Sequence, residues 1–149
     1  MGPLACPREG VIRISKESGI GWSVCSIDDS GGTPVAIIND ITNLQFATPR
    51  AVQDVTGLDK SAMERLLLLA DFSITLNGVF NDDASVGSHI VFKTVPSTSV
   101  ARTTTLTVSA QTLANEVFYT DYPLSRSDSG ELTFSVPGVL SSGVVPTWS

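Results

Sequence analysis

Residues 55–80 constrain the fold most, because the spacing of their apolar residues changes within one uninterrupted stretch. Ser61 and Glu64 have the spacing of a helix capping box, and Ala62, Leu66 and Leu69 follow at helical intervals. This pattern predicts one short amphipathic helix over about residues 59–69.

From Ala70 the period becomes two. Phe72, Ile74 and Leu76 alternate with polar residues, and Asn77-Gly78 is a dipeptide that favours a turn. A half-buried strand is therefore expected directly after the helix, with its apolar side chains turned toward a core.

Similar short apolar or alternating segments, separated by turn signals, recur along the rest of the chain. They cover residues 11–16, 22–27, 34–38, 41–47, 51–56, 88–95, 100–110, 117–122 and 131–136. No alternation of strands with helices is present, so the pattern predicts a mainly β fold, a β-sandwich or barrel flanked by one short helix.

The length of 149 residues fits a single domain over residues 1–149. We expect an N-terminal arm over 1–10, a β-sandwich over 11–136 and a C-terminal arm over 137–149. Both arms contain proline and apolar residues without strand periodicity.

Composition favours an assembling protein over a nucleic-acid-binding one. Hydrophobic residues make up 42% of the chain and charged residues only 16%, which is apolar for a free monomer of this size. The net charge of -6 argues against a protein that grips nucleic acid through its phosphates.

The sequence contains no arrangement of residues that predicts catalysis, a metal site or a cofactor. The two cysteines, Cys6 and Cys25, are far apart, and the single histidine, His89, falls on a predicted strand. We expect His89 to be a solvated strand residue and the protein not to be an enzyme. Neither a signal peptide nor an apolar run of membrane-spanning length is evident, so a soluble protein with no membrane anchor, made in a reducing compartment, is expected.

Three segments, in the order given, carry a resemblance to a known family. They are DVTGLDKSAMERLLLLADFSITLNGVFND from Asp54, EVFYTDYPLSRSDSGELTFSVPG from Glu116, and GVVPTW from Gly143. Together they resemble the major tail proteins, or tail tube proteins, of long-tailed phages that infect actinobacteria.

The resemblance implies a β-sandwich flanked by one α-helix, six copies of which close into a ring. Such rings would stack into the tail tube, the conduit through which the genome leaves the capsid. The implied partners are other copies of the chain, the tape measure, terminator and tail-tip proteins, and DNA that passes without tight binding. The implied location is the virion, after assembly in the cytoplasm of the host bacterium.

Two other functions remain open from the sequence. One is a related protein of the same fold: a tail terminator, a tail-tip ring protein or the tube of an injection device. The other is a carbohydrate-binding or receptor-type β-sandwich, for which the stacking candidates are Trp22, Tyr119, Tyr122 and Trp148.

For a tube, the sequence also predicts which residues face the lumen and which face other subunits. A wall that DNA slides past should be acidic or neutral, and the outward positions of the better strands carry no basic residue. We expect the lumen to be lined from the outward positions Asp71, Ser73, Thr75, Thr103, Thr105, Thr107, Glu116, Asp121, Glu131 and Thr133. The candidate charged lumen-facing residues among them are Asp71, Glu116, Asp121 and Glu131. The candidate inter-subunit residues, all in the predicted arms, are Leu4, Val139, Leu140 and Trp148.

Overall fold

Strands dominate the computed structural model, which describes Lys16 and residues 18–149. The strands are β1 (Trp22–Asp28), β2 (Pro34–Ala36), β3 (Ile41–Ala47), β4 (Arg50–Asp54), β5 (Arg65–Ala70), β6 (Ser73–Val79), β7 (Arg102–Val108), β8 (Gln111–Tyr119), β9 (Leu124–Arg126) and β10 (Leu132–Leu140). The described helical elements are the α-helix α1 (Ser88–Phe92) and the 3₁₀ turns η2 (Gly19–Gly21) and η3 (Ile38–Asp40). The predicted fold class, mainly β with one short helix, is confirmed.

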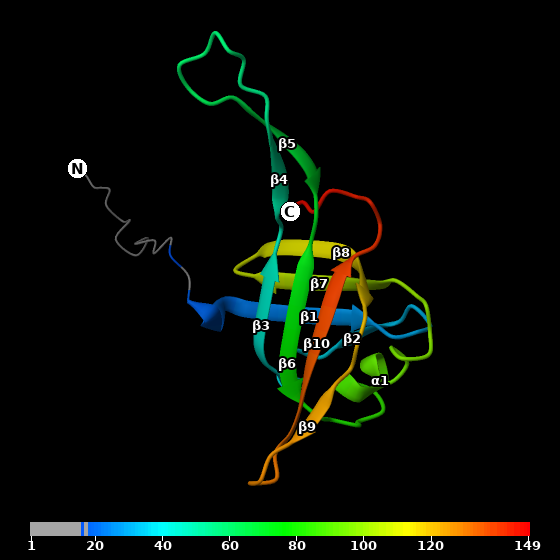
Figure 1. Ribbon diagram of the computed structural model, residues 1–149. Coiled ribbons are helices and arrows are strands. Elements are labelled where there is room, and N and C mark those ends of the chain that lie inside the picture. Colours follow the sequence, from blue (N-terminus) through cyan, green and yellow to red (C-terminus); the bar gives the residue numbers. More distant parts are fainter. Residues whose placement is uncertain (1–15, 17) are drawn as a thin grey trace, which may run out of the picture.

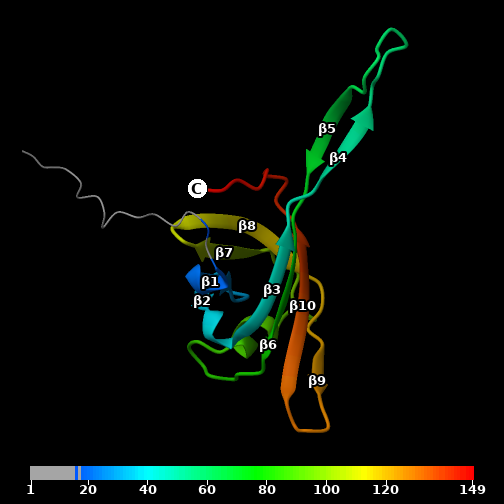
Figure 2. The ribbon, with the colours of Figure 1, turned by 90° about the vertical axis from the view of Figure 1, so that its left-hand side faces the viewer.

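Eight strands form one antiparallel sheet in the order β2-β1-β7-β8-β10-β6-β3, with β9 paired to β10. The sheet folds back on itself into two layers, so that β3, β6 and β10 run across β1, β7 and β8 (Figures 1 and 2). Helix α1 lies beside β9 and β10 at one end of the sandwich (Figure 1).

The two layers join where the end of β8 pairs with the end of β10. Gly138 lies there opposite Tyr119, and a Cβ atom at Gly138 would come within 2.7 Å of Val117 Cγ1 and 2.9 Å of Tyr119 Cε1. Only glycine lets the two strands approach this closely, so Gly138 fixes the corner between the layers.

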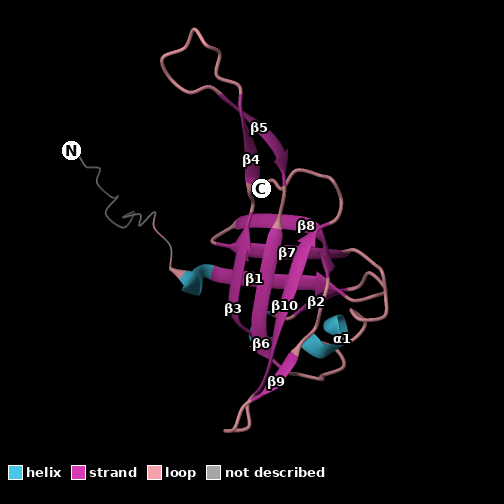
Figure 3. Ribbon diagram, in the orientation of Figure 1, coloured by secondary structure: helices cyan, strands magenta, loops and turns pink. Residues whose placement is uncertain are grey.

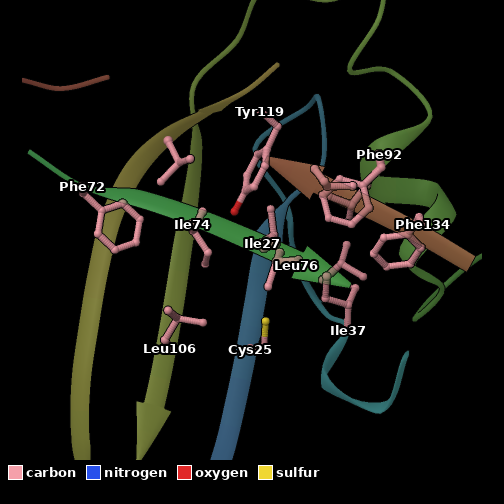
Figure 4. Close-up of a cluster of buried hydrophobic side chains, with 14 of the residues drawn as sticks. Cys25, Ile27, Ile37, Phe72, Ile74, Leu76, Phe92, Leu106, Tyr119 and Phe134 are labelled. Atoms are coloured by element: carbon pink, nitrogen blue, oxygen red, sulfur yellow. The ribbon is translucent and has the colours of Figure 1, made fainter. Parts of the chain in front are cut away.

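The core fills the space between the layers (Figure 4). The residues predicted to face inward from the strand after Ala70, namely Phe72, Ile74 and Leu76, are all buried. Leu106, Phe134 and Val136 are buried as well, and the alternation after Ala70 thus identified its part of the core correctly.

The predicted helix over residues 59–69 is wrong. Residues 65–70 form strand β5, which pairs with β4, and residues 55–64 form the tip of the resulting hairpin (Figure 3). A short isolated helix is marginal in water, and the hairpin provides ladder hydrogen bonds that extend the neighbouring pair β3 and β6. The capping-box spacing at Ser61 and Glu64 is therefore coincidental.

The α-helix lies instead at Ser88–Phe92, within the range 88–95 that was predicted to be a strand. Its N-terminus is held by the buried carboxylate of Asp40, whose Oδ2 accepts a hydrogen bond from the Ser88 N–H at 2.9 Å. The other oxygen, Oδ1, accepts from Asn81 Nδ2 at 3.0 Å. A residue 48 positions away in the chain thus sets where the helix begins, which local periodicity does not reveal.

His89 belongs to this helix and not to a strand, and it is half-buried. Its ring packs against Phe80 with centroids 4.7 Å apart, and Nδ1 lies 3.2 Å from the Tyr122 hydroxyl. The prediction of a solvated strand residue is therefore wrong in both respects, because α1 turns the ring onto the aromatic end of the core.

The C-terminal boundary also differs from the prediction. Strand β10 continues through Leu140, so residues 137–140, assigned to the C-terminal arm, belong to the sheet. Near the C-terminus, Trp148 forms an isolated bridge with Leu113, and Ser149 exchanges two backbone hydrogen bonds with Thr112. The predicted N-terminal arm, 1–10, and most of the predicted first strand lie outside the described residues.

Cys25 gives the stability of this core a testable pH dependence. Burial raises the pKa of its thiol to about 12, whereas the unfolded chain titrates near 8.5. Because the folded state keeps its proton to a higher pH, stability linked to Cys25 is complete below about pH 8.5 and falls as the pH rises toward 12. We expect the free energy of unfolding, measured with urea from pH 8 to 10.5, to fall less steeply with pH for Cys25→Ala than for the wild type. Equal slopes would contradict a buried thiol.

Candidate assembly surface

The β4–β5 hairpin projects away from the sandwich (Figures 1 and 2). Its strands form a separate two-stranded sheet, joined to the body at the base, where Asp71 N–H donates to the Pro49 carbonyl at 3.0 Å. We refer to residues 50–70 as the assembly hairpin. A two-stranded ribbon alone is marginally stable in water, so its position outside the core calls for contacts with another molecule.

The assembly hairpin is apolar to an unusual degree for an exposed element. Leu67 is 61% exposed and Leu69 is 90% exposed. Its other large exposed apolar residues are Val52, Val55, Leu58, Met63, Leu66 and Leu68. Monomeric proteins rarely expose so many neighbouring apolar side chains, and such patches mark interaction sites.

Both faces of the hairpin are apolar. Val52 is the cross-strand partner of Leu67, and Gln53 is the partner of Leu66. Cross-strand partners share a face and consecutive residues point to opposite faces, so leucine side chains project from each side. A strand with a continuous apolar run is typical of burial on both faces, which indicates that the hairpin is covered from two sides in its working state.

The polar residues of the tip hold the hairpin closed. Asp54 accepts hydrogen bonds from the Thr56 hydroxyl at 2.6 Å and the Thr56 N–H at 2.9 Å, and these bonds lower the pKa of the Asp54 carboxyl. Thr56 Oγ1 in turn accepts from the Glu64 N–H at 2.8 Å. The tip therefore keeps a defined shape although none of its side chains reaches the core.

The four candidate lumen residues do not share one surface. Asp71 precedes β6 and Glu131 precedes β10, at opposite ends of the β3–β6–β10 layer, while Glu116 lies on β8 in the other layer. Asp121 lies in the loop after β8, where its Oδ1 accepts from the Tyr122 N–H. The structure therefore does not bring the four carboxylates together.

Two of these carboxylates have side-chain partners in their own chain. Glu131 accepts hydrogen bonds from the hydroxyls of Ser129 at 2.5 Å and Ser127 at 2.8 Å, which lower the pKa of the Glu131 carboxyl. Glu116 is bonded to the Thr103 hydroxyl. All three bonds connect side chains that are neighbours in a turn or across a strand pair.

The candidate inter-subunit residues occupy different environments. Val139 is exposed at the outward side of β10, whereas the side chain of Leu140 packs against the core. Trp148 packs on Phe46 of its own chain at 5.9 Å between centroids and remains 44% exposed. Leu4 lies outside the described residues. A contact with a neighbouring subunit stays a prediction for Val139 and Trp148.

Sequence reasoning missed the exposed leucines of β5, above all Leu67 and Leu69, as an assembly surface. The signal was present in the unbroken run RLLLLA, which suits a strand buried on both faces as well as a helix. The helical spacing instead assigns Leu66 and Leu69 to one face of a helix.

The aromatic residues do not form a sugar-stacking platform. Tyr119 is buried and Tyr122 packs beside Phe92 and Phe134, while Trp22 packs edge-on against Phe46 at 6.2 Å. Trp148 contacts the same Phe46. These rings belong to two packed clusters and do not form a flat, exposed set. The carbohydrate-binding alternative requires such a set for stacking against a sugar ring, and this structure does not provide it.

Within the described residues, His, Cys, Asp and Glu side chains form no group of three or more that could hold a metal ion. No helix in the same part of the chain has the length and apolar character that crossing a membrane requires. The assembly hairpin is thus the feature of the described surface that most clearly calls for a partner.

The chain matches no protein-family model and no curated protein sequence. Two solved structures have a similar fold. A chain of the tail of an empty gene transfer agent particle, determined with C6 symmetry, superposes with a TM-score of 0.68 and 16% identity, over 90% of this chain and 98% of that one. A chain of the virion of a native gene transfer agent particle gives a TM-score of 0.68 and 16% identity, over 89% and 99%. The overall β fold of this chain is therefore one that gene transfer agent particles also contain.

Proposed function

We propose that this chain is a structural, non-catalytic protein of a phage-like tail that assembles with copies of itself into rings, six to a ring. The rings stack into the tail tube, and the tube conducts the genome to the host. The other tail components, namely the tape measure, terminator and tail-tip proteins, are its further partners. The virion of a phage of actinobacteria is its location, after assembly in the host cytoplasm.

The assembly hairpin carries this proposal. It exposes apolar side chains on both faces, and no described part of the chain covers them. Copies of the same chain are the simplest partners, because a head-to-tail contact between an arm and a different surface repeats without limit and builds rings and filaments. The fold shared with chains of gene transfer agent particles, one of them determined with C6 symmetry, supports the same assembly.

Electron microscopy of the purified full-length protein, concentrated at neutral pH, tests the proposal. We expect long hollow tubes with six-fold symmetry in end-on views. Single rings that never stack would instead favour a terminator or tail-tip protein of the same fold. A protein that stays monomeric at every concentration would contradict self-assembly.

A further inference from the structure

The outward face of β3, β6 and β10 carries no charged side chain. We refer to it as the charge-free face, and it consists of Asn43, Gln45, Ala47, Ser73, Thr75, Asn77, Val79, Ser125, Thr133, Ser135, Pro137 and Val139. Soluble domains usually carry charged residues at about a quarter to a third of their surface positions, so a whole sheet face without one calls for an explanation.

The strand register arranges this face in rows. Asn43, Asn77 and Ser135 are aligned across the three strands, and Gln45, Thr75 and Pro137 form the next row. Apart from Pro137, the two middle rows therefore carry amide and hydroxyl groups, and valines appear only at the two ends of the face. A shallow hollow of about 420 Å³ lies at one end of it, lined by Thr42, Asn77, Ser125, Thr133 and Ser135 together with Gly78, Pro123, Leu124 and Phe134.

The chain places its charges around this face and not on it. Asp71 precedes the face at the hairpin end, and Glu131 and Arg126 lie near its other end. The outward side of β8 differs, since it carries Glu116 and the exposed ring of Phe118. The absence of charge is thus specific to one layer of the sandwich.

The chemistry of the charge-free face excludes two other uses. The centre of a stable protein interface is apolar and often aromatic, whereas the middle of this face is hydrophilic. A sugar-binding face needs exposed rings for stacking, and none of its members is aromatic. The charge-free face is therefore a hydrated surface that has no charged group with which to bind a charged molecule.

We propose that the charge-free face lines the bore of the tube and is the surface over which duplex DNA slides. This inference rests on the proposed function and specifies which layer faces the DNA. Lysine or arginine at these positions would bind phosphates and release counterions, and every such contact would have to break during passage. Hydroxyl and amide groups remain hydrated and hold phosphate only weakly, so the DNA meets little resistance.

The inference corrects the choice of lumen residues made from the sequence. Ser73, Thr75 and Thr133 belong to the charge-free face, while Glu116 belongs to the other layer. Asp71 and Glu131 then lie at the two ends of the bore-facing surface of each subunit. The wall is neutral along its middle, not acidic.

Cysteine labelling of assembled tubes tests which face lines the bore. We use Ser135→Cys on the charge-free face and Ala114→Cys on the outward side of β8, both in a Cys6→Ser background, since Cys25 is buried and unreactive. Each variant is treated, as monomer and as tube, with a small maleimide and with a maleimide carried on streptavidin, which is too wide to enter a bore that fits one duplex. Both reagents should label both monomers.

In tubes, Ser135→Cys should react with the small maleimide at the monomer rate, while its reaction with the streptavidin conjugate falls at least tenfold. Labelling by both reagents would place Ser135 on the outside, and protection from both would place it in an interface. Either result overturns the inference, as does size-selective labelling of Ala114→Cys, because the two outward faces of a sandwich cannot both line one bore. Failure of all variants and the parent protein to form tubes would instead contradict the proposed function.

A second measurement tests the sliding argument. Tubes of Ser135→Lys should retain a duplex DNA fragment at low salt about tenfold more than wild-type tubes, and the retention should disappear at high salt. Ser135→Asn tubes, which keep the face uncharged, should behave like the wild type. Equal retention by Ser135→Lys and wild-type tubes would overturn the inference.

Discussion

Replacing Leu67 and Leu69 together with aspartate should abolish tube formation while the subunit unfolds at nearly the wild-type temperature. Both side chains project from the assembly hairpin and take no part in the core, so the folded monomer loses little. In an assembled tube, however, the substitution would bury unpaired carboxylates, each costing several kcal/mol per contact. Sedimentation and electron microscopy measure assembly, and thermal unfolding by circular dichroism measures the fold.

The matched control is Leu67→Ile combined with Leu69→Val, which keeps these positions apolar, introduces β-branched side chains that suit a strand, and should leave tubes intact. If the aspartate variant formed tubes of normal length, the assembly hairpin would not be part of the interface between subunits. A large fall in the unfolding temperature of the aspartate variant would show that the hairpin packs on its own body in solution.

The alternation of apolar and polar residues predicted much of the body of the fold. The prediction was correct for β6 and β10, because each strand has one face on the core and one in water. In such a half-buried strand, every second residue is apolar. The mainly β fold class followed from the same pattern. What alternation could not supply is the order of strands in the sheet, which depends on pairings between distant segments such as β1 with β7.

Prediction from the sequence failed for elements that do not have one buried and one exposed face. β5 is exposed on both sides in the single chain, so its leucines have no period of two, and spacing alone assigned them to a helix. Helix α1 is short, and its position depends on a carboxylate from η3. Both errors have one cause: β5 is fixed by pairing with β4 and α1 by Asp40, and neither contact is recorded in the spacing of the element's own residues.

The turn between β7 and β8 illustrates a further limit. Ser109 and Ala110 have φ angles of 47° and 68°, a left-handed conformation that glycine and asparagine usually provide. Neither residue signals a turn, so the predicted strand ran through Ala110. Pairing along the whole length of β7 and β8 holds the turn in place.

The lumen residues stay a prediction, and the structure shows which of the selected residues share a face. The requirement for a wall without basic groups selected Ser73, Thr75 and Thr133, which the structure places on one face. It also selected Glu116, because alternation assigns a residue to an outward side but not to a layer. Only the strand order separates the two outward faces.

Asp40→Ala should lower the free energy of unfolding by about 3 kcal/mol, which is a large share of the stability of a small domain. The buried carboxylate accepts hydrogen bonds from the Ser88 N–H and from Asn81 Nδ2, and thereby connects η3 to the start of α1. Alanine leaves both donors without a partner in the interior. Because α1 places Val91 and Phe92 in the core, loosening its N-terminus also weakens packing around these side chains. Urea unfolding followed by tryptophan fluorescence gives the difference.

Two variants distinguish the loss of the hydrogen bonds that Asp40 accepts at the start of α1 from a general effect of removing an acidic residue. Asp71→Ala removes an exposed carboxylate that caps only the N–H of the next residue, Phe72, and should cost well under about 1 kcal/mol. Asp40→Asn keeps one acceptor oxygen but turns an amide N–H toward a donor, so its loss should fall between those of the two alanine variants. Equal, small losses for Asp40→Ala and Asp71→Ala would mean that α1 is held by its apolar side chains alone. The expected order, with Asp40→Ala the least stable, would make a single buried carboxylate responsible for where the one described α-helix begins.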